Sequence, residues 1–157
     1  LAVLLGHGHP DLLDIGERNP TLHADQVALI GVRDIDELEA QRIRRSGVWV
    51  ETMRHLDEVG MDRMMTRVLA RFKGRVDWIH VSFDVDYLDP SIAPGVGTPV
   101  RGGPSYRESH MCMEKLSESG LVGSVDLTEL NPILDVRNQS AELCVELLQS
   151  LFGKRLL

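Results

Sequence analysis

The feature that most constrains this fold is the regular alternation of short apolar runs with longer amphipathic segments. The apolar runs have the length and composition of buried strands, and they cover residues 26–32, 48–51, 76–83 and 121–127. The segments with helical periodicity cover residues 36–46, 60–72, 106–118 and 138–152. Such alternation predicts an α/β fold: three α/β/α layers, with a mainly parallel sheet and helices on both of its faces.

Two of the predicted helices carry further signals. Residues 36–46 place acidic side chains first and arginines last, which complements the helix dipole, and Gly47 then ends the segment. In residues 60–72 the methionines share one helical stripe with other large apolar residues, which indicates packing in the core rather than a cofactor site. Residues 6–25 are rich in Gly, Pro, Asp and Asn, so we expect an irregular loop there.

The charge balance narrows the kind of function. With 17 basic and 24 acidic residues, the chain has a formal net charge of -7, whereas nucleic-acid binders usually carry a basic excess. An acidic balance suits a cationic small molecule through weak electrostatic steering. No stretch approaches the roughly 18 apolar residues of a membrane span. We therefore expect neither a nucleic-acid partner nor a membrane partner.

The cysteines and the first residues of the chain indicate the cellular compartment of the protein. Cys112 and Cys144 match no zinc spacing and no CxxC pattern, so we interpret them as buried thiols of a protein in a reducing compartment. Residues 1–5 are too short for a signal peptide and lack a basic flank. These features predict a cytoplasmic protein.

Ligands in α/β folds bind beyond the carboxyl ends of the strands, and three carboxylates follow the predicted strand at 76–83. They are Asp84, Asp86 and Asp89. Carboxylates held close together repel one another unless a cation compensates them, and hard divalent ions prefer such oxygen ligands. If the strand continued, Asp84 and Asp86 would lie on the same face. A solvated surface turn ended by Pro90 is the alternative.

The other strand ends are also polar. Glu129 follows the predicted strand at 121–127, and a carboxylate there can bind a guanidinium through paired, charge-assisted hydrogen bonds. Nearby, residues 126, 128 and 131 can serve simply as caps and turn residues. After the strand at 26–32, Arg33 and Asp34 can form a structural ion pair, and Asp36 can cap the helix that follows.

The histidines give weaker signals. His7 and His9 form an HxH pattern, which can bind metal, although it lies in the Gly- and Pro-rich segment. His80 is expected within a strand, and His55 and His110 at the surface or at a helix edge. No pair of histidines has the helical i, i+4 spacing with an acid between them.

The segment 80–90 (HVSFDVDYLDP) resembles the second metal motif of the ureohydrolases, the arginase and agmatinase family. The resemblance extends in the family's order through residues 30–36, 93–100, 102–103, 106–108 and 126–132. It implies an arginase-like fold in which residues 1–157 form the C-terminal part of a single ureohydrolase domain.

The resemblance also implies a set of roles. Asp84 would bridge two Mn²⁺ ions and Asp86 would bind one of them. Glu129 would hold the substrate guanidinium and take part in catalysis, and Thr98 would line the substrate site. The family reaction hydrolyses a guanidinium to urea and an amine, with water activated by the paired metals.

The segment after residue 30 favours L-arginine as substrate, with L-ornithine and urea as products. By resemblance to arginases, Asp36 would contact the α-amino group of the amino acid, a group that agmatine lacks, and Glu39 would lie nearby. The run Thr98–Val100 and the pair Asn131–Pro132 also resemble arginases. Agmatinase, guanidinobutyrase and proclavaminate amidino hydrolase are the alternative activities, and family members usually form homotrimers or hexamers.

The sequence departs from the family in what it lacks. Complete ureohydrolases are about twice as long and carry Gly-Gly-Asp-His and Asp-Ala-His-x-Asp motifs, which supply other metal ligands; neither occurs here. The loop at 7–11 (HGHPD) is not expected to replace them. We therefore expect that the N-terminal part of the fold is missing, and that the isolated chain is inactive and prone to aggregation. The competing hypotheses are a non-catalytic remnant acting through oligomer contacts and an unrelated metal-binding α/β domain.

Overall fold

The computed structural model describes residues 1–154, and the chain forms two compact units. The first unit consists of residues 1–30 and 35–51, and the second consists of residues 31–34 and, among the described residues, 52–154. No described helix combines the length and the apolar character that crossing a bilayer requires.

The first unit contains one longer helix and a small sheet. Its elements are η1 (Val3–Leu5), α1 (Pro10–Leu13), η2 (Ala24–Gln26) and α2 (Glu37–Ser46), together with most of β1 (Ala28–Val32) and of β2 (Trp49–Thr52). The apolar runs predict strands β1 and β2, and the two strands pair in a two-stranded sheet. The segment 6–25 is not wholly irregular, because Pro10 at the first helical position starts the short α1.

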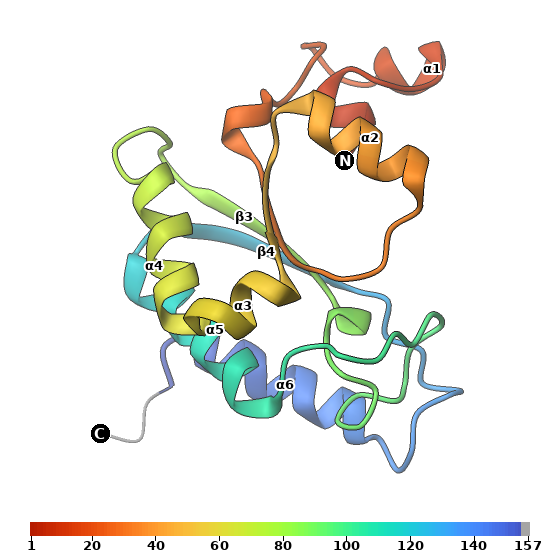
Figure 1. Ribbon diagram of the computed structural model, residues 1–157, viewed down its shortest axis with the longest axis vertical. Helices are drawn as coiled ribbons and strands as arrows, with labels where there is room; N and C mark the ends of the chain where they lie inside the picture. The colour runs from red at the N-terminus through yellow and green to blue at the C-terminus, as the bar shows by residue number, and fades with distance from the viewer. Residues whose placement is uncertain (155–157) are drawn as a thin grey trace. The chain divides into compact units, whose positions relative to one another are not determined.

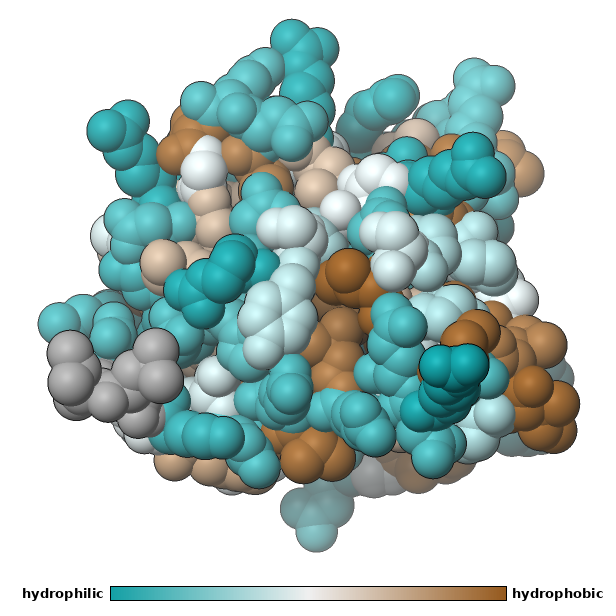
Figure 2. Space-filling model, turned by 90° about the horizontal axis from the view of Figure 1, so that it is seen from below, coloured by the Kyte–Doolittle hydropathy of each residue, from teal (hydrophilic) through white to brown (hydrophobic). Residues whose placement is uncertain are grey.

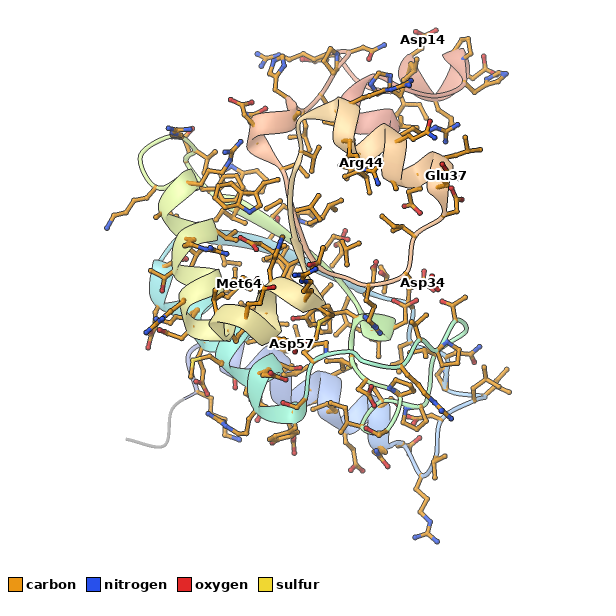
Figure 3. The ribbon with its side chains drawn as sticks, viewed as in Figure 1. Asp14, Asp34, Glu37, Arg44, Asp57 and Met64 are labelled. Atoms are coloured by element: carbon orange, nitrogen blue, oxygen red, sulfur yellow. The ribbon has the colours of Figure 1, made fainter. Side chains whose placement is uncertain are left out.

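Helix α2 forms where the charge pattern predicts it. The Asp36 side chain caps its start by accepting a hydrogen bond from the Glu39 amide at 2.8 Å. Figure 3 shows Glu37 near the start of α2 and Arg44 near its end, the order that complements the helix dipole. Gly47 ends the helix in the left-handed conformation, with φ 76°.

The second unit carries the remaining helices and a second pair of strands (Figure 1). Its elements are α3 (Met53–Val59), α4 (Met61–Phe72), β3 (Ile79–Asp84), η3 (Val85–Tyr87), α5 (Tyr106–Ser119), β4 (Val122–Thr128) and α6 (Gln139–Leu151). Helix α3 is not predicted by the apolar pattern. It begins at a capping box in which the side chains of Thr52 and His55 each accept the other's backbone N–H.

The core of this unit lies among α4, α5 and α6. Met64 and Met65 on α4 are fully buried, as the stripe predicts, and Met65 contacts the thiol of Cys112 on α5 at 3.6 Å. Both cysteines are free and buried, which confirms their interpretation as thiols. The expectation for His110 is wrong: it is 7% exposed, because it lies on the face of α5 toward α6 and hydrogen-bonds Ser150 at 2.8 Å.

Strands β3 and β4 are parallel and lie side by side (Figure 1). One face of the pair is apolar, with Phe83 buried, and the other face is exposed and polar. In the polar face, residues 80, 82 and 84 of β3 lie opposite residues 124, 126 and 128 of β4. The exposed face of the pair is therefore a row of polar side chains that ends at Asp84 and Thr128.

Candidate metal centre

Asp84 lies at the carboxyl end of β3, and its register partner holds it. The hydroxyl of Thr128, directly opposite on β4, donates a hydrogen bond to Asp84 Oδ1. Thr128 is therefore a strand residue that orients a carboxylate, and its interpretation as a cap or turn residue is wrong. The bond therefore holds one oxygen of the Asp84 carboxylate.

Asp86 follows in a different element. The strand ends at Asp84 and the chain turns into η3, so the expectation that both carboxylates lie on one face of a continuing strand is wrong. A helical turn replaces the two-residue alternation here. The Asp86 carboxylate is held instead by Thr98, whose hydroxyl donates to Asp86 Oδ2 at 2.6 Å. The structure thus joins two residues that the sequence assigned to metal binding and to substrate binding.

The third carboxylate, Asp89, forms hydrogen bonds with both ends of the loop 91–103, which carries Thr98. It accepts hydrogen bonds from Ser91 (hydroxyl 2.5 Å, amide 3.0 Å) and from the amides of Gly102 (2.8 Å) and Gly103 (3.3 Å). These bonds, those of Ser91 foremost, lower the pKa of Asp89 to about 2. Asp89 is therefore ionised at neutral pH, with its oxygens engaged by the loop that carries Thr98.

Arg33 binds this region through main-chain carbonyls. Its guanidinium donates to the carbonyl oxygens of Asp86 (2.8 Å) and Tyr87 (3.0 Å) and to that of Val100 (2.8 and 3.3 Å). The structure shows no ion pair between Arg33 and Asp34, so that interpretation is not supported. Arg33 belongs to the second unit together with the loop that it contacts.

Glu129 follows β4 directly and has an unusual backbone. It is exposed and adopts φ 65°, which a residue with a side chain rarely does. Its neighbours fix it there: Leu130 forms a bridge with Val96, and the Asn131 amide donates to the Gly95 carbonyl at 2.7 Å. Conformations of this kind cost roughly 1–3 kcal/mol and are found preferentially at functional sites.

The polar face of the sheet contains one cluster that the sequence did not reveal. His80 Nδ1 lies 2.8 Å from the Ser124 hydroxyl, and His80 Nε2 lies 3.4 Å from the Asp126 carboxylate. All three side chains are exposed. A parallel alignment of the two strands would have found these pairs, because His80 and Ser124 are register partners. Asp126 is therefore not a cap or turn residue.

Asp36 and Glu39 lie in the first unit, and both are exposed. The alternative interpretation of Asp36 as an N-cap is confirmed, since its Oδ1 accepts the Glu39 amide. The cap uses one carboxylate oxygen and leaves the side chain at the surface.

The donor atoms at the end of β3 fit a hard divalent cation in kind. Asp84 and Asp86 offer carboxylate oxygens, which Mg²⁺, Ca²⁺ and Mn²⁺ prefer. Their number is small, however. Within residues 1–154 no group of three or more His, Cys, Asp and Glu side chains is placed to hold a metal ion, whereas octahedral oxygen sites use about six ligands. The two aspartates fit as one part of a ligand set.

Fold and site together define an α/β protein whose acidic groups gather beyond the carboxyl ends of parallel strands, where ligands of this fold class bind. Comparison with known proteins identifies the family within this class. Residues 13–153 match the sequence model of the Arginase family, and the chain belongs to that family.

Arginases are among the proteins that this chain matches. The arginase of Bacillus caldovelox is 50% identical over 157 residues, which are 100% of this chain and 52% of that protein. Its solved structure superposes with a TM-score of 0.96 at 49% identity, over 99% of this chain and 52% of the other. Entamoeba histolytica arginase, solved in complex with L-ornithine, gives a TM-score of 0.90 at 29% identity, over 98% and 51% of the two chains.

These matches confirm the predicted arginase-like α/β fold. The chain spans about half the length of the curated relatives that it matches.

Proposed function

We propose that this chain is the C-terminal part of a single ureohydrolase domain that hydrolyses L-arginine to L-ornithine and urea with two Mn²⁺ ions. The observation that carries the proposal is the pair of aspartates, Asp84 and Asp86, each held by a threonine hydroxyl at the end of a parallel strand. Family membership and the arginase relatives support it, and so does the L-ornithine in the E. histolytica structure, since L-ornithine is the amine product expected here.

The residues at the end of β3 would have the following roles in metal binding. Asp84 would bridge the two ions and Asp86 would bind one of them; the ions, when bound, supply activated water at neutral pH. Thr128 and Thr98 hold one oxygen of each aspartate, which leaves the other oxygen to face a cation.

Substrate binding falls to the other acidic residues. Glu129 would bind the guanidinium through two parallel hydrogen bonds, a geometry that a rigid backbone helps to maintain. Asp36 would contact the α-amino group of the amino acid, with Glu39 nearby. This last contact favours L-arginine over agmatine, because agmatine has no such group.

The experiment is a urea-release assay on the complete reading frame that contains this chain, loaded with Mn²⁺ and given L-arginine, agmatine or 4-guanidinobutyrate. We expect turnover of L-arginine, with kcat/KM lowered about 100-fold or more by Glu129→Gln, the loss of a charge-assisted contact to the substrate. Glu142→Gln, at an exposed position of α6, is the matched control and should have no effect. Preference for agmatine would replace the proposed substrate, and no turnover with any of the three would reject the activity.

Metal binding by the 157-residue chain can be measured separately. Because two carboxylates are too few for two ions, calorimetry with Mn²⁺ should show weak binding that Asp84→Ala abolishes. Tight binding of two ions by the chain would show that ligands other than those assigned here complete the site.

A second candidate function is a non-catalytic role through contacts between subunits. It is favoured by an exposed apolar segment before α6. In that segment Ile133 is 91% exposed and Val136 is 55% exposed. On the face shown in Figure 2, hydrophobic side chains interrupt the hydrophilic surface in several places.

The upstream coding sequence distinguishes the two candidates, because an in-frame Asp-x-His-x-Asp motif supports the enzyme and its absence supports the remnant. In either case we propose a homotrimer or homohexamer, which sedimentation can test. The free thiols of Cys112 and Cys144 support a reducing compartment such as the cytoplasm.

A further inference from the structure

Arg33 makes an unusual number of main-chain contacts for a single side chain. Its half-buried guanidinium donates to four carbonyl oxygens, those of Asp86, Tyr87, Leu88 and Val100, at distances from 2.8 to 3.4 Å. A guanidinium can do this because it presents five N–H groups in a fixed, planar fork. A lysine ammonium, with three donors on one atom, cannot span the same set.

The four carbonyls belong to two separate segments. Asp86, Tyr87 and Leu88 are in and after η3, and Val100 is in the loop two residues beyond Thr98. The same two segments are joined a second time, by the hydrogen bond from the Thr98 hydroxyl to Asp86 at 2.6 Å. Arg33 therefore joins the backbones of the segments whose side chains meet at the candidate metal centre.

The residues around Arg33 fit the same region closely. At Gly31, two residues earlier, a Cβ atom would collide with the ring of Tyr87, and the backbone has φ 79°. Tyr87 is half-buried, and its ring packs edge-on against Phe83 of β3, with ring centroids 5.7 Å apart. The segment 31–34 is thus fitted to η3 by a close contact as well as by hydrogen bonds, which limits how Arg33 can move.

We propose that Arg33 is a positioning residue for the metal centre: it fixes the distance between the turn that carries Asp86 and the loop that carries Thr98. The inference rests on the proposed function for the role of these two residues. Arg33 itself touches neither substrate nor metal, and it acts through the backbone that presents them.

The first test compares hydrogen exchange by NMR in the metal-free 157-residue chain and two variants. Arg33→Lys keeps the charge and removes the fork. Arg54→Lys is the matched control, because Arg54 is exposed on α3 and its Nε donates to Glu58 at 2.9 Å. We expect Arg33→Lys to speed exchange of the amides of Leu88 and Gly102 by about tenfold or more, with the α5–α6 core unchanged. Exchange in the loop equal to that of the Arg54→Lys variant would overturn the proposal.

The second test uses Mn²⁺ as a paramagnetic probe. In the unmodified chain, substoichiometric Mn²⁺ should broaden the resonances of Asp84, Asp86 and Thr98 together. In Arg33→Lys, Asp84 should still broaden, because Thr128 holds it, while Thr98 should broaden less than Asp84. A purely structural effect would change all three equally, and that result, like an unchanged pattern, would overturn the proposal. If the unmodified chain shows no broadening at these residues, its proposed metal site fails, and the metal-free exchange decides on Arg33 alone.

A third measurement covers the case in which Arg33→Lys does not fold. In the unmodified chain, the Nε–H proton of Arg33 should exchange with water at least about tenfold more slowly than that of Arg54, because Arg33 is half-buried and donates to Val100. Equal exchange at the two side chains would show that the contacts of Arg33 do not persist in solution, and the proposal would fall.

Discussion

Replacing Ser140 with alanine should destabilise the second unit far more than its size suggests. Ser140 is fully buried at the start of α6, where its hydroxyl donates to Asp135 Oδ1 at 2.7 Å and accepts the Gly95 amide at 2.8 Å. Alanine removes both bonds and leaves the buried Gly95 N–H without a partner. An orphaned buried donor costs about 1–3 kcal/mol and the bond to Asp135 about 1 kcal/mol more. Asp135 is half-buried and keeps the Ser140 and Ala141 amides, so we expect a loss of roughly 2–4 kcal/mol.

The assay is urea unfolding followed by circular dichroism, with Ser91→Ala as the control. The Ser91 hydroxyl also donates to an aspartate, Asp89, at 2.5 Å, but Ser91 is exposed, so water can replace the lost bond. Its loss should stay below about 1 kcal/mol. Against a typical total stability of about 5–15 kcal/mol, the expected difference is large enough to measure. If the two variants lose equal stability, burial of the Gly95 amide is not what makes Ser140 important.

Three further outcomes follow from the packing and the ionisation of the second unit. Leu147→Ala, at a fully buried position of α6, should lower the free energy of unfolding by about 2–5 kcal/mol in the same urea assay, and a loss under 1 kcal/mol would contradict its place in the core. Gly31→Ala should cost about 2 kcal/mol or more, from the left-handed backbone and the collision with Tyr87, as a lower midpoint of thermal unfolding would show. The pKa of His110 in the folded protein lies below 6.5, chiefly because the side chain is buried. As the pH falls, His110 is therefore protonated in the unfolded chain before it is protonated in the folded one, and the free energy of unfolding should decrease below about pH 6.5. His110→Gln should flatten that decrease between pH 5 and 6.5, and an unchanged slope would assign it to other groups.

The sequence predicts those elements whose apolar periodicity is long. The stripe of α4 and the dipole-ordered charges of α2 each determine a helix within a residue of its observed bounds. Helix α3 has seven residues, too few to show a repeat, and it depends on the reciprocal bonds of Thr52 and His55. The burial of His110 could also have been predicted from the sequence, because His110 lies one helical turn before the buried Met113.

The candidate site was predictable in its carboxylates and not in their supports. Asp84 and Asp86 are visible as acids after an apolar strand, whereas the step from β3 into η3 leaves no sequence signal. Thr128 becomes visible only when the two strands are aligned in register. The contacts of Arg33 could not be predicted, because its acceptors are main-chain carbonyls 53 to 67 residues away in the sequence. Every residue type carries such a carbonyl, so the acceptors leave no sequence signal.

The exposed polar face of the β3–β4 pair, with the turn that follows it, offers a test of whether natural selection still maintains the chemistry of this chain. Asp84 is exposed on this face and Asp86 is half-buried in the turn that follows it, and substitutions outside a packed core usually change stability little. A copy released from catalysis could therefore lose both acids at little cost. Both acids are present, and each is still bonded to its threonine. Comparing substitution rates at these four positions with rates in the α5–α6 core among natural variants would show whether selection for chemistry still acts on the chain.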